Sequence, residues 1–204
     1  MNAIIKICKQ FQSAYYYFII FPFYKILFNK IGAGTRILKP LKIEGYENIA
    51  LGKKVVIGKF TWLASIPLTG KLANLEIHDG TVLGNFNHIY ATRSIVIESK
   101  VLTADKVYIS DNLHGYKNID VPIMDQPIEQ LLPVVIGEGS WLGENVCVFG
   151  ASIGKHCVIG ANSVVNKNIP DYCVAVGSPA KIVKRYNVEE KSWKKTDSMG
   201  NFII

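Results

Sequence analysis

The chain has 204 residues, of which 49% are hydrophobic, and it carries a formal net charge of +7 at pH 7. This length and apolar content predict one domain with a continuous core. The positive charge allows an anionic partner, but no recognised nucleic-acid-binding motif is present, so nucleic acid is not expected. The four cysteines form no CxxC pair and show no metal-ligand spacing. Free thiols in a reducing compartment are therefore expected, rather than a disulfide framework.

Residues 1–30 are expected to form an apolar helical segment. Residues 14–24 are an uncharged run of aromatic and aliphatic side chains, which is too short for a spanning helix of about 20 residues. No small-residue cleavage site follows it, so a secretory signal is not favoured. Two alternatives remain. The helix packs on the end of the fold or on a neighbouring subunit and caps an open β edge, or it lies on the inner face of an anionic membrane with its lysines at the lipid headgroups.

The positive charge is concentrated near the N-terminus. Residues 1–60 contain ten Lys or Arg and only two Glu, a net charge of +8 within this segment. A second basic cluster lies near the C-terminus, between residues 181 and 195. Such clusters suit anionic lipid or phosphorylated small molecules.

Branched aliphatic residues recur at every sixth position in the middle of the chain. They are Ile77, Leu83, Ile89, Ile95, Val101 and Val107. A period of six fits neither a helix nor a flat strand. It fits a chain wound as a triangular prism, with one short strand on each face and about eighteen residues in each coil, as in hexapeptide β-helix solenoids. The same spacing occurs within 31–55, 136–148 and 153–165.

The repeat is interrupted in two places. Residues 58–76 break the period, as a loop with a partial coil would, and residues 111–133 lose it completely. Long excursions from a compact fold are usually functional. The solenoid domain is therefore expected to span 31–186, with an extruded loop at 111–133. The polar tail 187–204 is expected to be a short helix or disordered.

One of the four histidines, His114, lies in the extruded loop. A loop leaving a rigid prism can place its histidine against a neighbouring subunit, and histidine suits a general base near neutral pH. The alternative is an ordinary surface histidine. His88 is expected to point outward, either without a role or lining an acceptor site. His78 and His156 are expected at solvated corners, and no closely spaced pair of histidines suggests a metal site.

Five further segments carry a more specific signal. They are Ser-Asp-Asn-Leu-His-Gly-Tyr at 110–116, Pro-Ile-Met-Asp-Gln-Pro at 122–127, Val-Val-Ile-Gly-Glu-Gly-Ser-Trp-Leu-Gly at 134–143, Val-Ile-Gly-Ala-Asn-Ser-Val-Val at 158–165 and Val-Gly-Ser-Pro-Ala-Lys at 176–181. With these segments the chain resembles the hexapeptide-repeat acyltransferases over roughly 31–186. The most similar subgroup is the sugar O-acetyltransferases of bacterial surface-polysaccharide clusters.

The resemblance implies an all-β fold, a left-handed parallel β-helix, assembled as a homotrimer with active sites between subunits. It implies a cytoplasmic O-acetyltransferase that uses acetyl-CoA as the acyl donor and a sugar hydroxyl as the acceptor. The family's catalytic histidine falls on His114, which would take the hydroxyl proton during direct transfer, without an acyl-enzyme. No metal is expected.

The resemblance also implies residues that bind the two substrates. The acceptor set is Asn87, carried over as an outward residue of Asn85-Phe86-Asn87, together with His88 and Tyr116. The acetyl-CoA set is Trp141, Gly143, Ala161, Asn166, Lys167, Lys181 and Lys184.

The chain departs from the family pattern in three places. The coil at 149–151 is one residue short, Asn112-Leu113 replaces the first histidine of a common Asp-His-x-His loop, and Asn166 replaces a common threonine. Two alternatives to O-acetylation stay open. One is an N-acyltransferase of the same fold acting on an amino sugar or another small acceptor. The other is a non-catalytic solenoid that binds glycan or assembles with other proteins.

Overall fold

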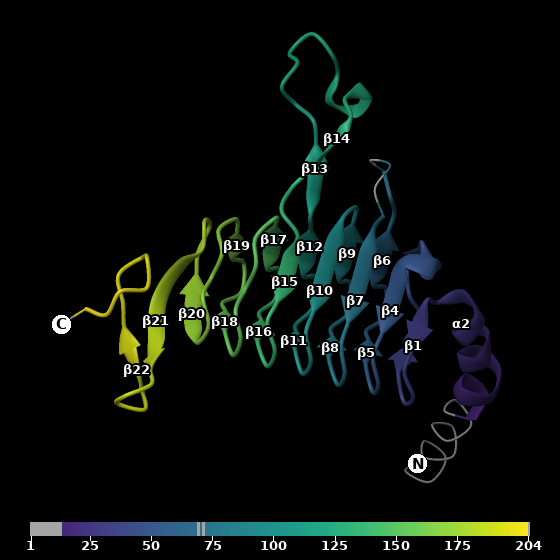
Figure 1. Ribbon diagram of the computed structural model, residues 1–204, viewed down its shortest axis with the longest axis horizontal. Helices are drawn as coiled ribbons and strands as arrows, with labels where there is room; N and C mark the ends of the chain where they lie inside the picture. Colours follow the sequence, from purple (N-terminus) through teal and green to yellow (C-terminus); the bar gives the residue numbers. More distant parts are fainter. Residues whose placement is uncertain (1–13, 69, 71, 204) are drawn as a thin grey trace, which may run out of the picture.

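The computed structural model describes residues 14–68, 70 and 72–203. Its body is a stack of coils in which short parallel strands form three faces of a prism (Figure 1). We name the faces A, B and C, and each edge of the prism by the two faces that meet there. The period-six pattern therefore predicted the architecture correctly.

The strands fall into three sheets. Face A contains β1 (Lys30–Ile31), β4 (Ile49–Leu51), β7 (Asn74–Ile77), β10 (Ser94–Ile97) and β15 (Val134–Ile136). Face B contains β2 (Arg36–Ile37), β5 (Val56–Ile57), β8 (Val82–Leu83), β11 (Leu102–Thr103), β16 (Trp141–Leu142), β18 (Val158–Ile159), β20 (Cys173–Val176), β21 (Lys181–Asn187) and β22 (Ser192–Lys195). Face C contains β3 (Lys42–Glu44), β6 (Trp62–Ser65), β9 (His88–Ala91), β12 (Tyr108–Ser110), β17 (Cys147–Phe149) and β19 (Val164–Val165).

The repeated aliphatic residues form the core of the prism. Every aliphatic of the period-six runs is buried, at 9% exposure or less. Many of these strands also bury a second residue two positions away, such as Leu51 or Ile97, because alternate side chains of a strand point to the same side. The period-six count missed this second position. It often holds a small polar residue, as at Thr35, Thr61, Thr81, Thr103, Ser140 and Ser163.

The edges of the prism require unusual backbone geometry. Along edge BC, non-glycine residues adopt φ between 44° and 59°, in the left-handed region that L-residues rarely occupy. They are Lys39, Phe60, Phe86, Lys106, Asn145 and Asn162. Gly58, on the same edge, lies so close to the next coil that a Cβ there would meet the Gly84 carbonyl oxygen at 2.1 Å. Successive coils therefore stack in contact at their corners as well as along their strands.

A helical segment packs on the first coil. A π-helical turn, Tyr16–Ile20, continues into α2 (Phe21–Leu27). Phe21 and Phe28 are buried in the core cluster, and the Tyr16 hydroxyl accepts a hydrogen bond of 3.0 Å from the Ile37 amide. The described part of the predicted N-terminal helix thus covers the end of the prism, while the part in residues 1–13 lies outside the described residues. No helix in the described ranges is long and apolar enough to cross a membrane.

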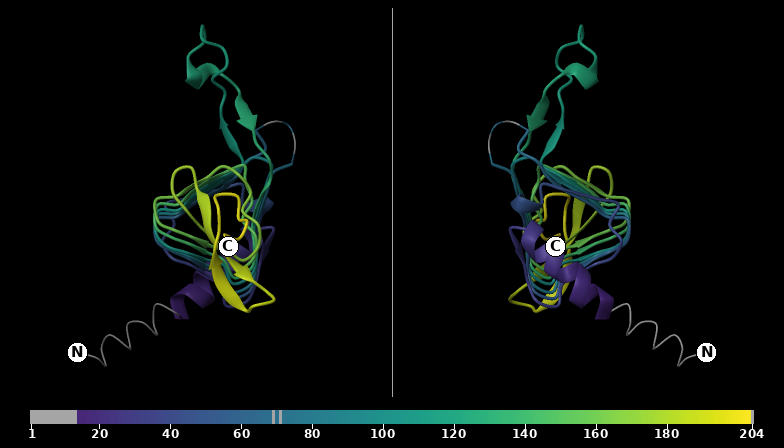
Figure 2. Two further views of the ribbon diagram at one scale, coloured as in Figure 1. Left: turned by 90° about the vertical axis from the view of Figure 1, so that its left-hand side faces the viewer. Right: turned by 90° about the vertical axis from the view of Figure 1, so that its right-hand side faces the viewer.

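The extruded loop forms a long arm at edge CA (Figures 1 and 2). Strands β13 (Asn112–His114) and β14 (Ile128–Gln130) pair antiparallel at its base, and a 3-10 turn, Ile123–Asp125, lies near its tip. The interruption expected at 58–76 is shorter than predicted, because β6 (Trp62–Ser65) keeps its place in face C and β7 begins in face A at Asn74.

The C-terminal tail differs from its prediction. Instead of a helix or disorder, residues 187–203 contain β22, which pairs antiparallel with β21, the strand that turns back antiparallel on β20. Tyr186 and Trp193, which face each other in this pairing, pack with ring centroids 5.5 Å apart. The charged residues hid this alternation of exposed and half-buried side chains.

Candidate active site

The arm presents His114 at the end of β13. His114 pairs with Ile128 across the hairpin and is exposed. Gly115 follows at a crowded point, where a Cβ would meet the Pro127 carbonyl oxygen at 2.6 Å, so only glycine fits there without displacing backbone. Tyr116 is also exposed on the arm. The arm therefore holds His114 and Tyr116 outside the prism, on the side of edge CA.

The root of the arm is held by a buried carboxylate, Asp111. One of its oxygens accepts hydrogen bonds from the Arg93 and Ser94 amides at 2.8 and 2.7 Å. The other accepts from the amide and hydroxyl of Thr92 at 2.7 and 3.0 Å. The Asp111 carbonyl accepts the Leu131 amide at 2.7 Å. Both ends of the arm are thereby fixed to the neighbouring coil, only three residues from His114.

A second group of bonds adds to this anchor. The Asn112 side chain donates to the Tyr90 carbonyl at 3.2 Å, and the Gln130 side chain donates to the Thr92 carbonyl at 2.8 Å. Sequence reasoning missed Asp111 and Gln130 as positioning residues. The only signal was their place, near the two ends of the segment that loses the repeat.

The structure corrects the expectation for Asn87. Its side chain is 1% exposed and points into the prism rather than outward. It donates to the Thr103 hydroxyl at 2.6 Å and accepts from the Val107 amide at 2.6 Å. Because both ends of the amide are used inside the core, Asn87 closes edge BC and is not available to a sugar. We therefore remove it from the acceptor site.

His88 points outward on face C, as expected, and joins an aromatic cluster. Its ring stacks on Trp62, with centroids 4.2 Å apart and planes 7° apart, and meets Tyr108 edge-on at 5.1 Å. Burial lowers the pKa of His88, and the nearby Glu44 carboxylate opposes this shift in part. Nε2 of His88 is buried without a hydrogen-bond partner in the described chain. Burial thus favours the neutral imidazole.

Trp141 and the residues after it lie on face B. Trp141 is 46% exposed, and its outward row continues in register through Val158 and Val174 to Lys184. At a rung spacing of about 4.8 Å, this row runs about 14 Å from an apolar to a basic end. Lys181 is exposed at the start of β21.

Gly143 and Ala161 lie beside each other on edge BC. A Cβ on Gly143 would come within 2.7 Å of the Ala161 nitrogen, so glycine is required there. On the same edge, the Lys59 and Asn85 amides donate to the side chains of Asn85 and Asp105. The Ala161 amide donates no hydrogen bond to the part of the chain that the structure describes. It is therefore free to meet a ligand near Trp141.

The remaining predicted cofactor residues, Asn166 and Lys167, are exposed at edge CA, where the chain leaves β19. They are not beside Trp141 in this chain. The arm that carries His114 also leaves the prism at edge CA, and in a triangular prism that edge lies opposite face B (Figure 2). One chain thus supplies the two halves of the predicted site on opposite sides of the prism. A site that contains both His114 and Trp141 needs a second copy of the chain.

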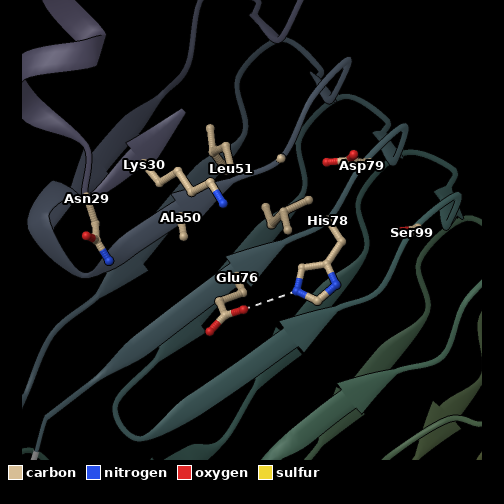
Figure 3. A pocket seen from close by; sticks show the side chains of 10 residues that line it. Asn29, Lys30, Ala50, Leu51, Glu76, His78, Asp79 and Ser99 are labelled. Carbon is tan, nitrogen blue, oxygen red and sulfur yellow. Dashed lines mark hydrogen bonds and ion pairs between the residues drawn. The ribbon is translucent and has the colours of Figure 1, made fainter. Parts of the chain in front are cut away.

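A separate hollow of about 580 Å³ lies on face A (Figure 3). In it His78 meets the Glu76 carboxylate at 3.1 Å, and the Asn74 side chain donates to the same carboxylate at 2.9 Å. The Asn74 and His78 hydrogen bonds lower the pKa of Glu76. Lys30 also lines the hollow. The pair is satisfied within one chain, and its strand β7 is separated from β15, where the arm rejoins the prism, by β10, so we do not assign it to the predicted site.

In the described residues the cysteine thiols are free and no cluster of metal-ligating side chains is present. Cys147, Cys157 and Cys173 are free, the latter two buried, as expected of reduced thiols, and Cys8 lies outside the described residues. In residues 14–68, 70 and 72–203, no three His, Cys, Asp or Glu side chains gather as a metal site would require.

Comparison with known proteins identifies relatives of this arrangement. The family model described as "Hexapeptide repeat of succinyl-transferase" matches residues 133–167. The putative lipopolysaccharide biosynthesis O-acetyl transferase WbbJ of Escherichia coli is 42% identical over 125 residues, 57% of this chain and 63% of that protein. A probable acetyltransferase of Mycobacterium tuberculosis is 43% identical over 122 residues, 59% of this chain and 39% of that protein. The chain thus spans less than two thirds of either relative.

A more distant relative is covered more fully. The galactoside O-acetyltransferase of Escherichia coli is 26% identical over 164 residues, 76% of this chain and 75% of that protein. Among solved structures, the N-acyltransferase AntD of Bacillus cereus aligns with a TM-score of 0.69 and 18% identity, over 83% of this chain and 89% of that chain. A hexapeptide-repeat acetyltransferase of Vibrio cholerae aligns with a TM-score of 0.58 and 21% identity, over 82% and 79%. These structures confirm the left-handed β-helix fold.

Replacing Asn87 with alanine should destabilise the protein. Asn87→Ala leaves the Val107 amide buried without a partner, which typically costs about 1–3 kcal/mol of unfolding free energy. Chemical denaturation measures this loss. Asn29→Ala, an exposed change, is the control and should stay within about 0.5 kcal/mol. If Asn87→Ala keeps the stability of the wild type but binds the acceptor more weakly, Asn87 belongs to the acceptor site after all.

Replacing Asp111 with asparagine should loosen the arm. The amide group of Asp111→Asn presents hydrogens to backbone N–H donors, so at least one buried donor loses its acceptor. We expect faster proteolytic cleavage within residues 115–127, measured by limited digestion. Asp120→Asn, an exposed substitution on the arm itself, is the matched control. Equal cleavage of the two variants would show that Asp111 does not hold the arm.

His88 should titrate below its ordinary pKa of 6.5. As the pH falls, the unfolded chain then binds a proton at His88 before the folded chain does. The free energy of unfolding should therefore decrease as the pH falls below about 6.5. Imidazole NMR signals followed against pH give the value. Glu44→Gln should lower the pKa further, since the carboxylate raises it. A His88 pKa at or above 6.5 in the wild type would contradict the buried, neutral state.

Proposed function

Because the chain belongs to the hexapeptide-repeat acyltransferase family, we propose that it is an acetyl-CoA-dependent O-acetyltransferase. Its acceptor is a sugar hydroxyl of a bacterial surface polysaccharide or of its precursor. The relative named as a lipopolysaccharide O-acetyl transferase supports this acceptor class. The observation that carries the proposal is the arm, which is anchored by a buried carboxylate and presents one exposed histidine.

The donor would lie along the outward row of face B. Trp141 offers an apolar surface to the pantetheine chain, and the free Ala161 amide can donate to one of its carbonyl groups. Lys184 and Lys181, at the other end of this region, supply positive charge for the phosphates. The structures of AntD are complexes with coenzyme A or an acyl-CoA, which supports this class of donor for the fold.

The active form is proposed to be a homotrimer with its sites between subunits. His114 and face B lie on opposite sides of one prism, so the arm of one copy would reach the face of the next. Repeating this contact around a threefold axis closes a ring and leaves every arm occupied. In this arrangement Asn166 and Lys167, on the edge that carries the arm, would face the donor of a neighbouring subunit.

His114 is proposed to act as the general base. It takes the proton of the acceptor hydroxyl as that oxygen forms its bond to the thioester carbonyl carbon. When the carbon–sulfur bond breaks, His114 returns the proton to the sulfur, so free CoA leaves and the imidazole is neutral again. His88 and Tyr116 would bond the acceptor near this point. The reaction would take place in the cytoplasm, in agreement with the free thiols.

Replacing His114 with alanine tests the proposal. Loss of a general base typically lowers the rate by about 10²–10⁴, and an exposed side chain can be removed without unfolding the arm. Thiol release from acetyl-CoA should fall by this factor in His114→Ala, with trimer formation and CoA binding kept. The acceptor panel should contain host polysaccharide fragments, matched amino sugars and reactions without acceptor.

His78→Gln is the control, because His78 lies in the hollow on face A, outside the proposed site. Near-normal turnover in His114→Ala would remove His114 from the mechanism. Transfer to amino groups alone would replace O-acetylation with N-acylation. Absence of CoA binding in the wild type would favour a non-catalytic solenoid.

A further inference from the structure

A groove of about 820 Å³ separates the N-terminal helical segment from the first coil. On the helix side it is lined by Tyr15, Tyr16, Tyr17, Ile20 and Tyr24. On the prism side it is lined by Arg36, Ile37, Leu38, Lys39, Pro40 and Lys59. It lies at the end of the prism, away from Trp141 and from the arm, and the proposed transferase reaction does not use it.

The charged residues of this groove have one sign. Arg36, Lys39 and Lys59 are exposed, and none forms an ion pair within the described residues. The sequence contains no Asp or Glu between residues 14 and 43. Three unneutralised cations at the mouth of an aromatic groove favour an anionic occupant.

The outer side of the same helical segment is apolar and uncovered. Phe18 and Ile26 are 80% and 82% exposed, and Ile19 and Phe23 are exposed between them. Ile19, Phe23 and Ile26 follow the i, i+4, i+7 spacing of one helical face. The opposite side, through Phe21, is buried against the prism. The helix therefore has two apolar sides, of which the fold uses one.

We propose that this end of the protein binds an anionic membrane surface. The exposed helical face enters the headgroup region, and a lipid phosphate lies in the groove against Arg36, Lys39 and Lys59. Tyrosines and lysines beside an apolar stripe are the composition of interfacial helices. A second copy of the chain is a poorer occupant, because a symmetric contact would bring two sets of the same three cations together.

Vesicle cosedimentation tests the membrane contact. The full chain is mixed with phosphatidylcholine vesicles and with vesicles containing added phosphatidylglycerol, without any acyl donor. We expect binding to the anionic vesicles that weakens as salt is raised, and little binding to the neutral ones. Because no acyl transfer is read, failure here would leave the proposed transferase reaction untouched.

Two sets of variants separate charge from apolar insertion. Each basic side chain near an anionic surface contributes about a fivefold change in affinity, so R36Q, K39Q and K59Q together should weaken binding about 10²-fold. K191Q with K195Q, at the far end of the prism, is the matched control. Phe18→Ser with Ile26→Ser should also weaken binding at least tenfold, and Val188→Ser is its exposed control.

Four results would overturn the proposal. One is equal binding to neutral and anionic vesicles in every variant. Another is an unchanged affinity for anionic vesicles in the triple variant. The third is a change in oligomeric state of Phe18→Ser with Ile26→Ser and no vesicle binding by the wild type, which would assign the helical face to a protein contact. Competition by inorganic phosphate with vesicle binding unaltered by the apolar variants would assign the groove to a free anion instead.

Discussion

The contact between successive coils is the constraint on which the rest of the structure depends. Each strand is only a few residues long, and a strand of that length gains little stability alone. Its hydrogen bonds run to the coils before and after it, and its aliphatic side chains stack on their counterparts in those coils. Every coil therefore stabilises its neighbours, as in other repeat proteins. The left-handed φ values and close glycine contacts at the edges are what this stacking requires.

Stacking also explains how the prism can carry so long an arm. The chain leaves face C after β12 and re-enters face A at β15, and these strands keep their places in the ladders on both sides. The gap between them is closed by the Asp111 carboxylate and by Gln130, which bond to the adjacent coil. The arm is thus an insertion between two fixed points. His114, the proposed general base, lies three residues from this anchored end.

The fold could be predicted well from the sequence because each repeated aliphatic residue stacks on its counterparts in the neighbouring coils. The aliphatic at every sixth position is buried in every case, and the extruded loop begins where the repeat is lost. The second inward residue of each strand was harder to see, since small polar residues such as Thr103 occupy it and bond to neighbouring coils. Asn87 belongs to this class, and its motif was mistaken for a surface one.

The site was predicted only in part because it is a property of several coils. Trp141, Gly143 and Ala161 lie together on one side, as the family resemblance implied. The stacking of His88 on Trp62 joins residues that the repeat alone does not mark as partners. Strand β22 was missed because the C-terminal tail lacks the period of six. The opposite placement of His114 and face B follows from the arm's edge, which sequence spacing does not report.

Both ends of the stack are closed by segments that do not continue it. The N-terminal helix packs beside the first coil, and the hairpin of β21 and β22 folds antiparallel after the last. An uncovered coil would expose unpaired strand edges, and a second molecule could then extend the ladder into a fibre. Closure of the ends therefore works against growth along the axis. The proposed trimer would instead join copies sideways, where an arm leaving one prism reaches the flank of another.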